Sequence, residues 1–127
     1  MEAPHTRARV AAHAADDKLA ADILVLDVGD IIGIVESFVI VSGSNSRQVK
    51  AIVENINESM QLVLDLKPKT IEGLDGATWV LLDYGDCIVH VFLDETREFY
   101  DLERLWADAP QVEWKSFVVE SLLDARS

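Results

Sequence analysis

The stretch SFVIVSGSNSRQVKAIVENINESMQLV, residues 37–63, predicts a strand, a turn and a helix in succession, and the fold is built around them. Its first six residues (37–42) are rich in the β-branched and aromatic side chains that favour strands. GSNS (43–46) predicts a turn in which Ser44 or Asn45 caps the following helix. Apolar residues then recur every three or four positions and predict one buried helix face: Val49, Ile52, Val53, Ile56, Met60 and Val63.

Further elements flank this stretch. Residues 4–21, rich in alanine and without internal Gly or Pro after the start, predict a helix. The continuous apolar run ILVLDV (23–28) predicts a strand that is buried on both faces. Downstream, Pro68 is expected to end the central helix. A short strand at 70–71 and a loop at 72–76 are expected to follow.

WVLLDY (79–84) and CIVHVF (87–92) predict a β-hairpin. With Tyr84 and Gly85 as a two-residue loop, Gly85 supplies the positive φ and Asp83 faces Asp86. Strand alternation then predicts one apolar face, formed by Val80, Leu82, Cys87, Val89 and Val91. The opposite face mixes aromatic and polar groups: Trp79, Leu81, Asp83, Asp86, Ile88, His90 and Phe92.

The last third of the chain is less sharply patterned. ETREFYDLERLWADAP (95–110) predicts one or two short helices. The tail, 112–127, carries apolar residues at helical spacing and predicts an amphipathic helix. No linker or low-complexity tract divides the sequence, so residues 1–127 are expected to form a single domain.

The charge balance bears on the kind of partner. The chain has 23 acidic and 11 basic residues, a formal net charge of −12. Such a surface repels nucleic acid, whose affinity for proteins comes largely from Lys and Arg, and attracts a basic protein. Solubility alone is the alternative explanation. One cysteine, no apolar run of membrane length and no secretory signal together predict a cytoplasmic protein.

Two runs, LVLDVGD (24–30) and VLLDYGD (80–86), end in Asp-x-Gly-Asp. Paired carboxylates at a strand end can hold Mg²⁺, and a Gly-Ser turn before a helix can bind phosphate, as in nucleotidyltransferases. Those enzymes use Asp-x-Asp, which aims both carboxylates to one side of a strand, whereas Asp83 and Asp86 flank a turn. Asp and Gly are also common turn formers. We therefore favour turns over a metal site and keep a metal-dependent enzyme as the alternative.

His90 is the only histidine outside the N-terminal segment. Cys87 is expected on the opposite face of the hairpin, which disfavours a catalytic Cys–His pair. His90 is therefore interpreted as a residue packed beside Trp79. The aromatic–polar side chains are either core beneath a helix or a protein-binding hot spot, and composition does not separate these readings: Trp79, His90, Phe92, Tyr100 and Trp106.

WVLLDYGDCIVHVF (79–92), followed by REFYDLERLW (97–106), closely resembles the ribosomal silencing factor family, RsfS, also called Iojap. The resemblance spans about residues 21–109 and leaves 110–127 as a C-terminal tail. Its upstream parts are DILVLDV (22–28), FVIVSGSNSRQVKAI (38–52) and the Glu72-Gly73 pair. It implies an α/β fold with a nucleotidyltransferase-like mixed β-sheet and flanking helices, but no catalysis and no cofactor.

Members of that family bind the large ribosomal subunit through its fourteenth ribosomal protein and block joining of the small subunit. The resemblance implies this role here, a homodimer in the free state, and no direct binding to nucleic acid or membrane. A dimeric interaction module with another target is a further alternative. By resemblance, the partner-binding residues are Trp79, Asp83, Tyr84, His90, Arg97, Tyr100, Asp101, Leu105 and Trp106.

Overall fold

Strands β2 (Ser37–Gly43) and β5 (Cys87–Leu93) run parallel at the centre of a five-stranded sheet. The structure is a computed structural model that describes residues 5–117 and 119. The strand order is β1-β2-β5-β4-β3, and all other neighbouring strands are antiparallel. The edge strands are β1 (Ala21–Asp27) and β3 (Thr70–Glu72), and β4 (Trp79–Asp83) lies between β5 and β3.

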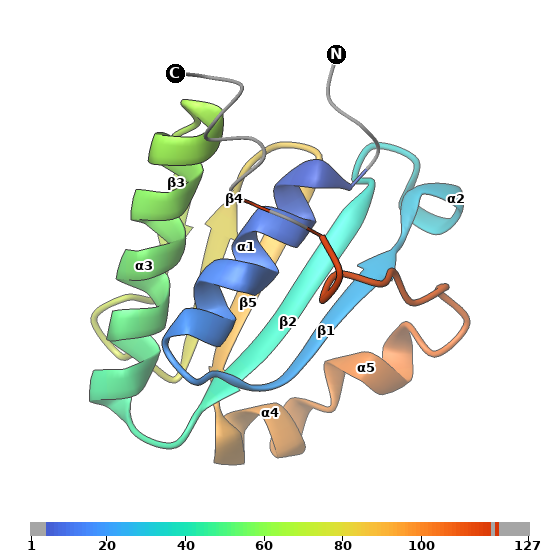
Figure 1. The fold of residues 1–127 in the computed structure, drawn as a ribbon. Coiled ribbons are helices and arrows are strands. Elements are labelled where there is room, and N and C mark those ends of the chain that lie inside the picture. Colours follow the sequence, from blue (N-terminus) through green and yellow to red (C-terminus); the bar gives the residue numbers. More distant parts are fainter. Residues whose placement is uncertain (1–4, 118, 120–127) are drawn as a thin grey trace.

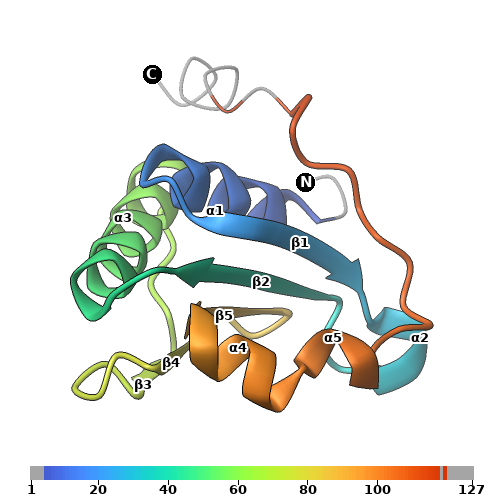
Figure 2. The same cartoon turned by 90° about the horizontal axis from the view of Figure 1, so that it is seen from below.

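Helices cover the two faces of this sheet unequally (Figure 1). Figure 2 shows α1 and α3 together on one face and the shorter α4 and α5 on the other. The helices are α1 (Thr6–Asp17), α2 (Gly29–Ile32), α3 (Ser46–Leu64), α4 (Asp94–Tyr100) and α5 (Leu102–Leu105). The predicted α/β class, a mixed sheet with flanking helices, is confirmed. No helix in the described part of the chain is long and apolar enough to cross a membrane.

Helix α3 forms as its apolar pattern predicts. Asn45 is the N-cap, and its Oδ1 accepts a hydrogen bond from the backbone N–H of Gln48 at 2.8 Å. All six residues of the predicted apolar face are buried. The helix ends just before Asp65, which adopts a left-handed conformation (φ 52°) and bonds its N–H back to the last turn. The expectation that Pro68 ends this helix is therefore wrong, since the chain leaves it earlier.

Strands β4 and β5 form the predicted hairpin with a different turn. The two-residue loop is Gly85-Asp86, and Gly85 has the positive φ (91°) expected of it. A hydrogen bond from the Tyr84 N–H to the Cys87 carbonyl, 2.9 Å, closes the loop. Asp83 therefore does not face Asp86, and every predicted strand partner is displaced by two residues. Because a shift of two preserves the side-chain alternation, the predicted faces of the strand residues are confirmed.

The side chain of Asp86 explains part of this difference. Its Oδ1 accepts a hydrogen bond from Arg7 Nη1 at 2.8 Å, and the same nitrogen donates to the Tyr84 carbonyl at 3.1 Å. The turn is thereby tied to the start of α1. Asp86 was expected on the strand face that carries His90, and that expectation is wrong because it is a turn residue.

Strand β1 lies at an edge of the sheet, although its apolar run is typical of an interior strand. Its second half is nevertheless buried, with Val25 and Leu26 on opposite faces. The segment after α5 covers the outer edge: the Asp27 N–H donates to the Pro110 carbonyl and the Val112 N–H donates to the Val25 carbonyl, both at 2.8 Å. Covering an edge in this way prevents its pairing with another chain.

The ends of the chain agree only in part with the prediction. The N-terminal helix is present over Thr6–Asp17, and residues 1–4 lie outside the described part. Residues 112–117 are not helical, so the tail helix predicted there is wrong for these positions, and 118 and 120–127 lie outside the described residues. The 95–110 segment gives two helices, as predicted, and 70–71 lies within β3.

Replacing Asn45 with alanine removes the side-chain acceptor that satisfies the first turn of α3. We expect the free energy of unfolding to fall by about 1 kcal/mol, the usual cost of losing an N-cap. Chemical denaturation followed by circular dichroism measures this change. Asn45→Asp keeps an acceptor and should stay near the original stability. Equal loss in both variants would contradict the capping role.

Candidate functional site

The two faces of the sheet have different chemistry. The face beneath α1 and α3 is filled by aliphatic side chains of the strands and helices, including Val39, Val80 and Val89. The other face carries the aromatic side chains of β2, β4 and β5, and α4 and α5 cover only part of it (Figure 2). Of the aromatic residues for which the sequence left core and hot spot open, some are buried and others reach the surface.

Five aromatic rings form a continuous row across this second face, which we call the aromatic strip: Tyr100, Trp79, His90, Phe38 and Trp106. Successive ring centroids are 4.9, 6.0, 5.0 and 5.2 Å apart in that order. The row begins at the end of α4, crosses β4, β5 and β2, and ends at the C-cap of α5. Separations of this size are those of interacting aromatic pairs.

The Tyr100 end of the strip is exposed, and further exposed apolar side chains lie beside it. Tyr100 is 51% exposed, and Phe99 and Leu105, on the same helical segment, are 81% and 75% exposed. Large apolar side chains grouped at a surface are typical of protein-binding sites, and aromatic residues dominate binding energy there. Acidic residues surround them on α4 and α5: Asp94, Glu95, Glu98, Asp101 and Glu103. The surface therefore combines aromatic groups with negative charge.

His90 lies within this strip as a neutral side chain. It is 5% exposed, and burial lowers its pKa to about 4. Its Nδ1 accepts a hydrogen bond from Trp79 Nε1–H at 3.1 Å, which places the remaining proton on Nε2. Nε2 has no partner among the described residues. His90 thus orients the Trp79 indole, in agreement with the interpretation that it packs beside that ring.

Cys87 lies on the opposite face, as predicted, so it does not pair with His90. Burial raises the pKa of its thiol to about 12, so the sulfur stays protonated near neutral pH. The side chain therefore has the character of a small core residue.

Arg97 holds α4 against the sheet. It is 8% exposed, and its Nη1 donates to the Ala21 carbonyl at 3.3 Å and to Ser42 Oγ at 3.2 Å. Its Nε donates to both carboxylate oxygens of Glu103 at 3.3 Å. These contacts join α4 and α5 to the β1–β2 edge. The guanidinium is directed inward, so its structural role is to position the segment that carries Tyr100.

The structure brings together four of the nine predicted partner-binding residues in the strip itself: Trp79, His90, Tyr100 and Trp106. Asp101 and Leu105 lie exposed on the same helical segment. Asp83 shares the β4 face with Trp79, four residues along the strand. Arg97 is turned inward.

Tyr84 lies on the helix side of the sheet, 2% exposed, and burial there raises the pKa of its hydroxyl. The expectation that Tyr84 is a loop residue is therefore wrong, since its side chain is packed in the core of the helix side.

Both Asp-x-Gly-Asp runs make the same turn. Asp27 Oδ1 accepts a hydrogen bond from the Gly29 N–H at 3.0 Å, and Asp83 Oδ1 accepts one from the Gly85 N–H at 2.8 Å. These are Asx turns, in which the carboxylate takes the place of a backbone carbonyl. The two residues thus act locally as the turn interpretation predicts. Within the described residues, no three potential ligands among His, Cys, Asp and Glu lie close enough to hold a metal ion.

Phe38, Phe99 and Gly73 were not predicted as site residues. Phe38 joins the strip only because β2 pairs with β5, and no local pattern indicates that pairing. Gly73 has φ +84°, and a Cβ there would lie 2.2 Å from the Trp79 carbonyl oxygen. Only glycine fits this close approach, so Gly73 sets the backbone position of Trp79. The Glu72-Gly73 motif is the sequence signal that marks it.

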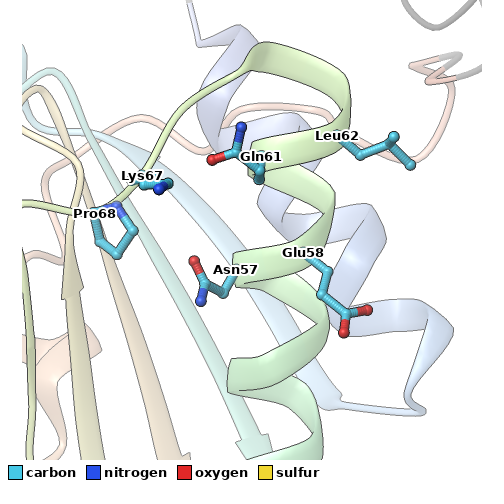
Figure 3. Close-up of a pocket in the computed structure, with 6 residues that line it drawn as sticks. All are labelled: Asn57, Glu58, Gln61, Leu62, Lys67 and Pro68. Atoms are coloured by element: carbon cyan, nitrogen blue, oxygen red, sulfur yellow. The ribbon is translucent and has the colours of Figure 1, made fainter.

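A hollow lies on the helix side of the sheet, between α3 and the loop that follows it (Figure 3). It measures about 600 Å³, and the side chains of Asn57 and Gln61 point toward Pro68 across the gap. Leu62 and Glu58 point away from Pro68 in the same view. No aromatic ring lines this hollow, so the aromatic strip has the stronger chemistry for recognising a protein.

Comparison with known proteins gives consistent matches. A family model described as "Ribosomal silencing factor during starvation" matches residues 1–126. The ribosomal silencing factor RsfS of Bacillus subtilis is 44% identical over 102 residues, which make up 80% of this chain and 86% of that protein.

Two further matches extend the comparison. The mouse protein named mitochondrial assembly of ribosomal large subunit protein 1 is 36% identical over 92 residues, covering 68% of this chain and 39% of its own length. A crystal structure from Bacillus halodurans superposes with a TM-score of 0.72 at 37% identity, covering 84% of this chain and 95% of that one. The fold is thus shared with a solved structure.

The buried, neutral state of His90 predicts a specific dependence of stability on pH. Its pKa is lowered from 6.5 to about 4 in the folded chain, so the unfolded chain binds the proton more readily. The associated stability is fully present above pH 6.5 and is lost as the pH falls through 4, by about 3 kcal/mol. Denaturation at pH 7, 5.5 and 4 measures the loss.

His90→Gln keeps an acceptor for the Trp79 N–H but does not titrate. We therefore expect its free energy of unfolding to decrease less between pH 7 and 4 than that of the original chain. The comparison uses the slope with pH, so a constant destabilisation by the substitution does not affect it. Parallel curves for the two chains would show that His90 does not titrate as the structure predicts.

Proposed function

The chain belongs to the ribosomal silencing factor family, and we propose that it binds the large ribosomal subunit and blocks joining of the small subunit. The contact is made through the fourteenth large-subunit ribosomal protein, and the result is lower translation when nutrients are scarce. The observation that carries the proposal is the aromatic strip with exposed apolar and acidic residues along α4 and α5. The name of the mouse relative, which refers to large-subunit assembly, supports the choice of subunit.

Inhibition on this proposal is steric and needs no bond to be made or broken. The protein docks at the face where the two subunits meet, and its volume excludes the small subunit. A ligand shifts an equilibrium only by its differential affinity for the two states. The ratio of its affinities for free and for joined large subunits therefore sets the degree of repression. The inhibition takes place in the cytoplasm, where the subunits join.

Recognition of a ribosomal protein rather than ribosomal RNA follows from charge. The net charge of −12 opposes approach to phosphates. The exposed charged residues of α4 and α5 around the strip are mostly acidic, with Arg104 as a basic exception, so the docking surface itself favours a basic partner. Complementary charge of this kind accelerates association and sets orientation, while the aromatic groups supply most of the affinity.

A metal-dependent nucleotidyltransferase-like enzyme is the second candidate. That enzyme would use Asp83 and Asp86 to hold Mg²⁺. The non-enzymatic proposal is favoured because Asp83 accepts the Gly85 N–H in an Asx turn and Asp86 is paired with Arg7. Isothermal titration calorimetry with Mg²⁺ and ATP distinguishes the two. Heat of binding that saturates at one nucleotide per chain would favour the enzyme.

Docking through the strip predicts that Trp79→Ala and Tyr100→Ala weaken binding to purified large subunits. Each truncation removes an aromatic contact, at about 1–2 kcal/mol, which is roughly a five- to thirtyfold increase in Kd. Co-sedimentation through a sucrose cushion measures binding, and the yield of joined ribosomes measures inhibition.

Leu62→Ala is the matched control for these truncations. Leu62 is 65% exposed and lies on α3, on the opposite side of the sheet. Its loss should change neither binding nor subunit joining. The proposal is refuted if the original chain neither co-sediments with the large subunit nor reduces joined ribosomes. It also fails in its assignment of the surface if Leu62→Ala weakens binding as much as Trp79→Ala.

We propose in addition that the free chain is a homodimer that uses the exposed apolar groups of α4 and α5. Light scattering over a concentration series should then give a mass that rises from 14.1 kDa toward twice that value. Leu105→Glu should keep the chain monomeric, since it places a charge in the contact. A mass of one chain at every concentration would contradict the dimer. The same result would also remove the basis for a third candidate function, that of a dimeric interaction module with another target.

A further inference from the structure

A pocket of about 390 Å³ opens between α4 and the start of β4. It lies at the Tyr100 end of the aromatic strip. The pocket is lined by Thr78, Trp79, Glu95, Thr96, Phe99 and Tyr100. Three of these six residues are aromatic, one is a carboxylate and two are hydroxyls. The pocket therefore offers aromatic rings, a negative charge and hydrogen-bond acceptors to a ligand.

The three rings are arranged around a space rather than stacked into a layer. The Trp79 and Tyr100 centroids are 4.9 Å apart with planes inclined by 48°, and Phe99 meets Tyr100 edge to face at 87°. Phe99 and Tyr100 are also largely exposed. Phe92 stacks on Trp79 at 4.8 Å and covers one face of that ring, so the more open rings are those of Phe99 and Tyr100. The negative face of an aromatic ring attracts a cation.

The charge around the pocket is negative and not neutralised by its own helix. Asp94, Glu95 and Glu98 lie exposed on α4, and the single basic residue of that helix, Arg97, is directed inward to Glu103. Among the described residues, no basic side chain forms an ion pair with Glu95. A cation entering the pocket therefore meets an unpaired carboxylate as well as three rings.

We propose that this pocket is a specificity site that receives an arginine side chain of the protein partner. The inference rests on the proposed function only in taking the partner to be a basic protein. A guanidinium is flat, so it stacks on one ring while its N–H groups donate to the Glu95 carboxylate and to the hydroxyls of Thr78 and Thr96. Arginine suits such a site better than lysine, whose ammonium is compact and more strongly hydrated.

The direct test is a nuclear magnetic resonance titration of the full chain with N-acetyl-arginine methylamide, carried out on the Leu105→Glu variant so that the proposed dimer contact does not cover the pocket. The probe should shift the indole N–H signal of Trp79, which is assigned by its loss in Trp79→Phe. The matched ligand is N-acetyl-citrulline methylamide, which has the same shape and no charge. We expect it to leave the signal unmoved. Equal shifts with both ligands, or no shift with either, would overturn the proposal.

Two variants connect the pocket to the partner. Glu95→Gln removes the carboxylate, and Glu54→Gln removes the same charge from the exposed face of α3. Glu95→Gln should abolish the shift by the arginine probe and raise the Kd for the large subunit by about fivefold at low salt. Glu54→Gln should change neither. Equal effects of the two variants would mean that only net charge matters, which also overturns the proposal.

The outcomes separate the pocket from the function it rests on. If the original chain does not bind large subunits but the arginine probe still shifts Trp79, the proposed function fails and the pocket remains. The opposite result is that the original chain binds large subunits and Trp79→Ala weakens this binding, while Glu95→Gln changes neither the shift caused by the arginine probe nor the affinity for large subunits. In that case the proposed function remains and the pocket proposal fails.

Discussion

The parallel pairing of β2 with β5 over seven residues organises the whole fold. A parallel connection cannot be a tight turn, so the chain must cross one face of the sheet before it returns. Here it does so as α3, which buries its apolar stripe against that face together with α1. The opposite face is left for the shorter α4–α5 segment. That segment is too small to cover the whole face, and the uncovered part is where the aromatic strip reaches the surface.

The same pairing determines which side chains meet at the site. β5 alternates small aliphatic residues toward the helices with Ile88, His90 and Phe92 toward the other side. Pairing with β2 then sets Phe38 beside His90, and pairing with β4 sets Trp79 within hydrogen-bond distance of it. Arg97 anchors the remaining part, because it ties α4 and α5 to the β1–β2 edge. The site is thus assembled from five separate elements, namely β2, β4, β5, α4 and the end of α5, and its geometry does not depend on one loop.

The local sequence pattern was sufficient to predict much of the fold. The spacing of Val49 to Val63 predicted α3, and the alternation in the hairpin predicted both of its faces, even though the turn lies one residue further along the chain. Properties that depend on distant segments could not be predicted. The apolar run of β1 did not reveal an edge strand, because residues 110–112 cover that edge from far along the chain. Likewise, Tyr84 and Arg97 belong to the family motifs, but both side chains are buried. Their burial results from contacts with distant segments, which the local sequence pattern does not predict.

Hydrogen–deuterium exchange of the chain, free and bound to purified large subunits, identifies the face that meets the ribosome. On the proposed function this is the partially covered aromatic face and not the helix-covered face. We expect slower exchange on binding in peptides that contain β4 and residues 94–106, and no change in peptides that cover α3. Protection confined to α1 and α3, with 94–106 unchanged, would contradict this expectation.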